Sequence, residues 1–168
     1  MFWCSSTAHA VLEIRITEGV EKPLPIAIVP FGWTGPAESQ PIFMESTISN
    51  DLARSGRFAP MDAKDMPQTP TEFAAVNFKD WRMLGMQNVV IGTLRETGPD
   101  LYEVEFRLLN SFSGSQLAGF RVPATRKQLR RTAHRVADIV FEKLNGVRGA
   151  FDTRIAYVTV KKAGQKSH

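Results

Sequence analysis

Three kinds of residue in this chain could take part in chemistry: the histidines, the single cysteine and a group of acidic side chains. Histidine occurs at positions 9, 134 and 168, and the only cysteine is Cys4. A hydrolytic site needs a nucleophile within hydrogen-bond reach of a base, and no motif pairs His134 with Cys4 or with a serine elbow. We therefore interpret His134, on a predicted helix, as a surface or packing residue, and we predict that the chain is not an enzyme.

The residues that ligate metals are too few, and are wrongly spaced, for a common metal site. Structural zinc sites use four cysteine and histidine ligands, which one cysteine and no closely spaced histidine pair cannot provide. Asp62, Asp65 and Glu72 lie in or near one predicted loop but lack the spacing of a calcium-binding loop. The sequence contains neither GxxxxGK nor GxGxxG, so no phosphate-binding loop is indicated. We predict no metal and no cofactor.

The densest charge is a basic run in the first half of the last predicted helix: Arg126, Lys127, Arg130, Arg131, His134 and Arg135. Cations near a helix N-terminus oppose the helix dipole by roughly a few tenths of a kcal/mol each, which hints at a partner. The run is the basis of an alternative function, a small basic nucleic-acid-binding α/β domain. A solvated face, with Arg135 paired to Asp138, also explains it, and no aromatic residues for base stacking interleave it. Our main prediction therefore includes no nucleic acid.

The composition is that of a folded domain. The 168 residues are 43% hydrophobic and 23% charged, which suits one domain with its own core. No run of 18 apolar residues occurs, so we predict no membrane span. The formal net charge of +4 is small and lies partly in the tail, at Lys161, Lys162 and Lys166. Charge alone therefore does not indicate a nucleic-acid partner.

The hydrophobic patterns predict elements in the order β-α-β-α-β-β-β-α. Strands are predicted at 24–31, 58–60, 88–95, 101–110 and 116–122, and helices at 42–55, within 72–84, and at 125–144. This order predicts the fold class α/β, a mixed β-sheet with helices packed on one face. Thr125 and Gln128 are placed for the capping box of the last helix. The side chains expected to face the core include Phe43, Met44, Ile48, Leu52, Phe78, Trp81, Leu84, Leu101, Val104 and Phe106, and, at the helical period of the last helix, Leu129, Ala133, Val136, Ala137, Val140 and Leu144.

The two ends of the chain carry further strand patterns. Apolar residues alternate with polar ones in 11–20, which is typical of a strand that pairs within its own domain or adds to the sheet of another protein. At the other end, Asn145-Gly146 predicts the end of the last helix and Gly149 a second break. Residues 153–160 then have the composition of a strand. Because eight residues cannot supply partners for that strand, we expect a junction with a second domain that is absent.

Several segments, taken in order, resemble the amino-terminal domain of the TolB family, part of the Tol-Pal system of the cell envelope. They are Pro25–Phe31, a core strand; Ser49–Phe58, a helix and turn; Trp81–Gly92, a helix-to-strand passage; and 141–162, the passage into the family's β-propeller. The resemblance covers roughly residues 12–161. It implies that 1–10 is the remnant of a truncated signal peptide, since Ala8-His9-Ala10 has the form of a cleavage site. It also implies a TolA-binding segment at 11–22, the amino-terminal α/β domain at 23–147, and the first strand of the absent β-propeller plus a tail at 148–168.

The resemblance further implies a periplasmic adapter that links TolA to Pal for outer-membrane integrity and cell division. In the family, the amino-terminal segment binds the carboxy-terminal domain of TolA, and the propeller binds Pal. We therefore expect TolA to bind residues 11–20, and Pal to bind only if the propeller were present. The predicted partner-binding residues are Leu12, Glu13, Ile14, Arg15, Ile16, Thr17, Gly19 and Val20.

Overall fold

The computed structural model describes residues 22–36 and 39–153. In that part of the chain the elements run in the order β1 (Leu24–Ile28), β2 (Gly32–Trp33), α1 (Met44–Arg54), β3 (Phe58–Pro60), α2 (Phe78–Met83), β4 (Asn88–Gly98), β5 (Leu101–Asn110), β6 (Ser115–Thr125) and α3 (Leu129–Asn145). Single turns of 3₁₀ helix lie at Ala63–Asp65, Phe73–Ala75 and Arg126–Gln128. The predicted element order is confirmed, and short β2 is an addition within a predicted loop.

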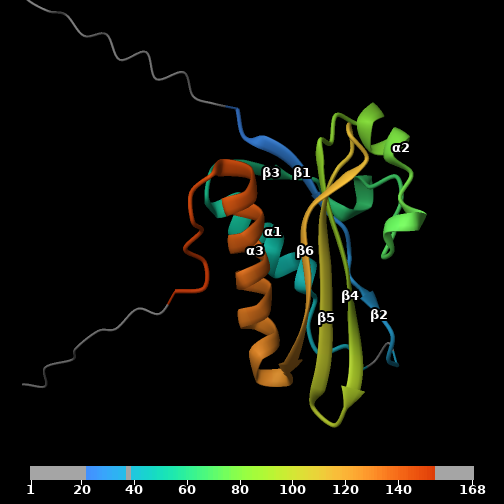
Figure 1. Cartoon of the computed structure of the whole chain (residues 1–168), viewed down its shortest axis with the longest axis vertical. Coiled ribbons are helices and arrows are strands. Elements are labelled where there is room, and N and C mark those ends of the chain that lie inside the picture. Colours follow the sequence, from blue (N-terminus) through green and yellow to red (C-terminus); the bar gives the residue numbers. More distant parts are fainter. Residues whose placement is uncertain (1–21, 37–38, 154–168) are drawn as a thin grey trace, which may run out of the picture.

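The strands form one mixed sheet in the order β3-β1-β4-β5-β6, and β2 pairs with the second half of β4. β1 is parallel to both β3 and β4, and β4, β5 and β6 form an antiparallel meander (Figure 1). A parallel pair needs a crossover, which α1 provides between β1 and β3. The predicted fold class, a mixed β-sheet with helices packed on one face, is thereby confirmed for α1 and α3, whereas the short α2 packs on the other face.

Helices α1 and α3 cover one face of the sheet and build the larger core. Alternate residues of β5, Val104, Phe106 and Leu108, point into it and are fully buried. The Phe106 and Phe120 rings meet edge to face at 4.5 Å between centroids. From α3, the buried residues recur at the helical period, as predicted: Leu129, Ala133, Val136, Ala137 and Val140.

The opposite face of the sheet is covered only in part. Trp81 of α2 is fully buried there against Val89, Ile91 and Leu109. Farther along the same face, β5 carries charged side chains at alternate positions, and Glu105 is one of them. The sheet therefore has one continuous apolar face under α1 and α3, and a second face that is apolar under α2 and charged beyond it.

Three residues predicted to face the core are exposed instead. Phe43 precedes α1 with an extended backbone, so it does not share the helical stripe, and the following Met44 is buried in its place. Leu84 follows the last residue of α2 and leaves the helical period. Leu101 differs from Val104 by three positions, whereas one face of a strand repeats every two, so Tyr102 is the buried residue.

Candidate functional site

The predicted partner-binding segment, residues 11–20, lies outside the described residues. So do Cys4, the pattern Ala8-His9-Ala10 and the predicted strand beyond Thr153. The described chain begins with Lys22 and Pro23, which are both exposed, and enters β1 next to β3 (Figure 1). The segment that precedes it therefore joins the domain at its surface.

The basic run at the start of α3 is largely occupied by contacts within the chain. The Arg126 Nε donates to Asp100 Oδ1 at 2.9 Å, and this hydrogen bond raises the pKa of Arg126. The guanidinium of Arg135 lies 5.8 Å from the ring centroid of Phe120, an arrangement typical of cation–π contacts. Because these cations serve separate partners, they do not form one free basic face.

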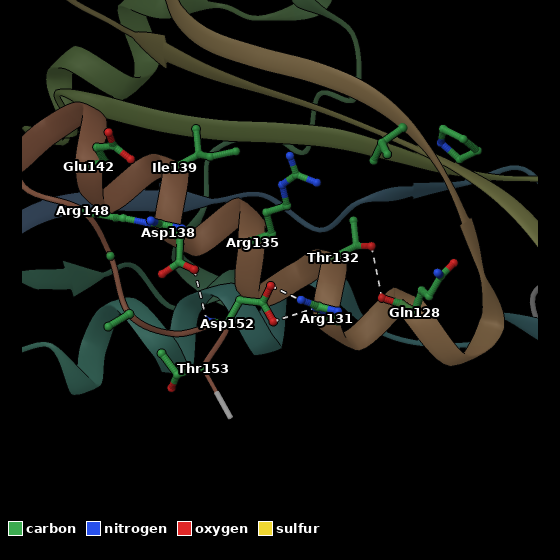
Figure 2. Close-up of a pocket in the computed structure, with 14 residues that line it drawn as sticks. Gln128, Arg131, Thr132, Arg135, Asp138, Ile139, Glu142, Arg148, Asp152 and Thr153 are labelled. Carbon is green, nitrogen blue, oxygen red and sulfur yellow. Dashed lines mark hydrogen bonds and ion pairs between the residues drawn. The ribbon is translucent and has the colours of Figure 1, made fainter. Parts of the chain in front are cut away.

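The Arg131 side chain fixes the segment that follows α3. Its Nε donates to both carboxylate oxygens of Asp152 at 3.0 Å (Figure 2). The ion pair between Arg135 and Asp138, which was predicted as part of a solvated helix face, is wrong. The Asp138 carboxylate instead accepts the backbone N–H groups of Phe151 at 2.7 Å and Asp152 at 3.1 Å. These hydrogen bonds hold the chain against α3 after the helix ends.

Helix α3, β6 and residues 148–153 enclose a groove of about 670 Å³. Figure 2 shows side chains of α3, among them Arg135, Asp138 and Glu142, along this groove. Gly149 lies so close to the helix that a Cβ atom on it would meet the Asp138 Cα at 2.7 Å. The second glycine break predicted from the sequence is therefore a packing contact, which lets the chain fold back along α3.

A buried carboxylate joins α1 to α3 beneath the basic run. Asp51 is only 1% exposed, and its Oδ2 lies 2.5 Å from the Nδ1 of His134. An ionised carboxylate only accepts, so the Nδ1–H of the imidazole donates this hydrogen bond. The other oxygen, Oδ1, accepts from the Arg54 guanidinium. His134 is thus a packing residue, as predicted, although its partner is 83 positions away in the sequence.

The sequence contains one signal for a pair of this kind, in the apolar stripe of α1. Asp51 stands within the apolar stripe of α1, between the buried residues Ile48 and Leu52. A charged residue is rarely buried without a partner of opposite charge. An aspartate at a core-facing position therefore predicts such a partner, but the stripe does not show which residue it is.

The open face of the sheet carries a second charged cluster. Glu105 accepts hydrogen bonds from Arg107 at 2.6 Å and from Arg121 at 2.5 Å. Burial of the Glu105 carboxyl opposes its ionisation, but the hydrogen bonds and charges of the two arginines outweigh this effect. The pKa of Glu105 therefore lies below its usual value of 4.5. These contacts tie β5 to β6 and stabilise the meander.

The described residues contain no group of three or more histidine, cysteine, aspartate or glutamate side chains that could hold a metal ion. Among the helices of residues 22–36 and 39–153, none is long and apolar enough to cross a membrane. The features that stand out in this part of the chain are two grooves flanking α3 and a charged sheet face.

The described residues form an α/β domain, with a mixed sheet, α1 and α3 on one face, and a backbone held against α3 beyond the helix end. The sequence model of the TolB amino-terminal domain matches residues 12–117. The chain therefore belongs to the TolB family, which confirms the resemblance drawn from the sequence.

Relatives and a solved structure agree with this family. The chain is 50% identical over 157 residues to the Tol-Pal system protein TolB of Thioalkalivibrio sulfidiphilus, covering 94% of this chain and 36% of that protein. It is 44% identical over 159 residues to the TolB of Nitrosococcus oceani, covering 95% of this chain and 36% of the relative. The crystal structure of TolB from Acinetobacter baumannii superposes with a TM-score of 0.63 at 25% identity, covering 77% of this chain and 30% of that one. The chain thus spans about a third of the length of these relatives.

Proposed function

We propose that this chain is a non-enzymatic, periplasmic protein–protein adapter of the Tol-Pal system. In this role it binds TolA, and it links TolA to Pal where a propeller is attached, in support of outer-membrane integrity and cell division. The observation that carries the proposal is the match of residues 12–117 to the TolB amino-terminal domain, a range that includes nearly all of the proposed binding segment. The arrangement of the described residues adds support of two kinds.

The first support concerns the availability of the segment for a partner. Lys22, which follows the segment, is exposed. We propose that residues 11–20 add as a strand to the edge of a sheet in the TolA carboxy-terminal domain. Backbone hydrogen bonds supply the pairing, and alternate side chains, Leu12, Ile14 and Ile16, are the apolar anchors.

The second support concerns the other end of the domain. Asp138 and Arg131 hold the chain at Phe151 and Asp152 against α3. Such a junction suits a second domain that is held in a defined orientation. This agrees with the proposal that residues 148–168 contain the start of a propeller, and with Pal binding only when that propeller is present.

The experiment is calorimetric titration of the TolA carboxy-terminal domain into the chain from Val11 onward and into a version that starts at Lys22. We expect only the longer chain to bind. A matched pair of triple variants then separates the two faces of the strand. Serine at positions 12, 14 and 16 abolishes binding, whereas alanine at 13, 15 and 17 leaves the affinity within about tenfold, because backbone pairing survives and the anchors remain. Equal binding by the version starting at Lys22 would contradict the proposal.

The nucleic-acid alternative receives no support from the geometry. Arg126, Arg131 and Arg135 each have a partner within the chain, which a phosphate backbone would have to displace. Nucleic-acid binding depends steeply on salt because counterions are released from the phosphates. We therefore expect no salt-dependent binding of an oligonucleotide to the full chain, measured by fluorescence anisotropy.

A further inference from the structure

A second groove, of about 330 Å³, lies between α1 and α3 on the surface above the buried carboxylate. Its charged lining comes from both helices: Asp51 and Arg54 from α1, and Arg130 and His134 from α3. Thr47 and Asn50 add a hydroxyl and an amide. The formal charges sum to at least one positive unit, because two arginines face a single aspartate.

The negative charge in this groove is withdrawn from its surface. Asp51 is 1% exposed, and each of its carboxylate oxygens already accepts a hydrogen bond, one from His134 and one from Arg54. The carboxylate of Asp51 is therefore already engaged by partners within the chain. A buried carboxylate in this position also holds the side chains of His134 and Arg54 in place.

The donors that remain in this groove come from the two arginine side chains, Arg54 and Arg130. The Arg54 side chain is 72% exposed, and of the five N–H donors that a guanidinium carries, one donates to Asp51. Arg130 is exposed, and no ion pair is recorded for it within the described part of the chain. His134 uses Nδ1 for Asp51, which leaves its Nε2 as the second ring nitrogen in the groove lining.

We propose that this groove binds a tetrahedral oxyanion of the phosphate class. Two arginine forks from adjacent helices match the several acceptor oxygens of such an anion, and bonds between guanidinium and phosphate are charge-assisted. The site is formed only when α1 and α3 are packed together, and it does not involve residues 11–20.

The test uses the full chain and inorganic phosphate, with sodium chloride adjusted to keep the ionic strength constant. Heteronuclear NMR spectra follow the Nε–H signals of arginine and the ring signals of His134 during the titration. We expect saturable shifts at Arg54, Arg130 and His134, and a dissociation constant about tenfold higher for Arg130→Gln, the effect of losing one charge-assisted donor. Arg148→Gln is the matched control, because it removes the same charge from the other groove.

A second arm distinguishes free phosphate from a lipid headgroup. Co-sedimentation compares vesicles of phosphatidylglycerol and phosphatidylcholine with vesicles of phosphatidylcholine alone. Either of two results supports the site, provided that Arg130→Gln weakens the binding and Arg148→Gln does not. Saturable binding of inorganic phosphate identifies free phosphate as the source, and sedimentation with phosphatidylglycerol vesicles identifies a lipid headgroup. Equal responses of the two variants in both arms, or no response in either arm, would overturn the proposal. Thermal unfolding of both variants confirms that each is folded under the conditions used.

Discussion

The hydrogen bond between Asp51 and His134 is expected to contribute measurably to the stability of the domain. Asp51→Asn keeps the size of the side chain but removes the charge, so the amide cannot accept from both His134 and Arg54. A hydrogen bond to a charged group contributes about 1.5–3 kcal/mol, and the His134 bond is of this kind because the two side chains are only 21% and 1% exposed. The Arg54 partner is 72% exposed, and an exposed pair adds less than about 1 kcal/mol.

Together these terms predict that Asp51→Asn lowers the free energy of unfolding by about 2–3 kcal/mol. For a domain of this size the unfolding midpoint should fall by roughly 5–10 °C. The assay is urea unfolding followed by tryptophan fluorescence, for which the buried Trp81 is a suitable probe. His134→Gln and the double variant complete a thermodynamic cycle, in which we expect a coupling free energy of at least about 1 kcal/mol.

The control is Arg54→Gln, which removes the exposed partner and should cost less than about 1 kcal/mol. The reasoning is refuted if Asp51→Asn and His134→Gln each change the free energy of unfolding by less than about 0.5 kcal/mol and add without coupling. That result would mean that apolar packing of α1 on α3 holds the helices together without help from the buried pair.

Three further predictions follow from close contacts and charges. The pKa of Glu105 is lowered in the folded state, so this carboxylate stabilises the fold above the usual carboxyl range, and the contribution is lost as the pH falls through the lowered pKa. Urea unfolding at about pH 7 and about pH 3 measures the loss. The free energy of unfolding should differ less between the two pH values for Glu105→Gln than for the unchanged chain. Gly92→Ala should cost about 2–3 kcal/mol in the same assay, because its Cβ would lie 2.5 Å from a backbone carbonyl oxygen, whereas Gly98→Ala, whose Cβ has no neighbour closer than 3.6 Å, should be nearly neutral. Gly149→Ala should push the chain away from Asp138, so hydrogen exchange of the two amides bound to that carboxylate should accelerate while exchange in the sheet is unchanged. Unchanged exchange at those amides would show that the segment tolerates the methyl group.

Local sequence patterns were sufficient for the type and order of the elements. The alternation in residues 101–110 and the helical period of 129–145 follow from backbone geometry, which is the same wherever those elements pack. Gly146 has a φ of 74°, so the glycine predicted to end α3 takes the left-handed conformation that favours this residue. The capping box is confirmed as well, since Gln128 Oε1 accepts the backbone N–H of Thr125 at 2.9 Å. The family resemblance likewise rested on short segments in order, and the sequence match confirms it.

The contacts that define the two grooves depend on the tertiary structure. Asp51 and His134 are adjacent in space only because α1 and α3 pack on the same face of the sheet. Periodicity places each residue on a face of its own helix but carries no information about which residue of another helix lies opposite. The same reason explains why Asp138 binds backbone amides beyond α3 instead of Arg135, one turn away in the helix. The sequence by itself thus determined the elements, the fold class and the family, whereas packing between distant segments determined the charged pairs and the grooves, because long-range contacts form only when the elements are assembled.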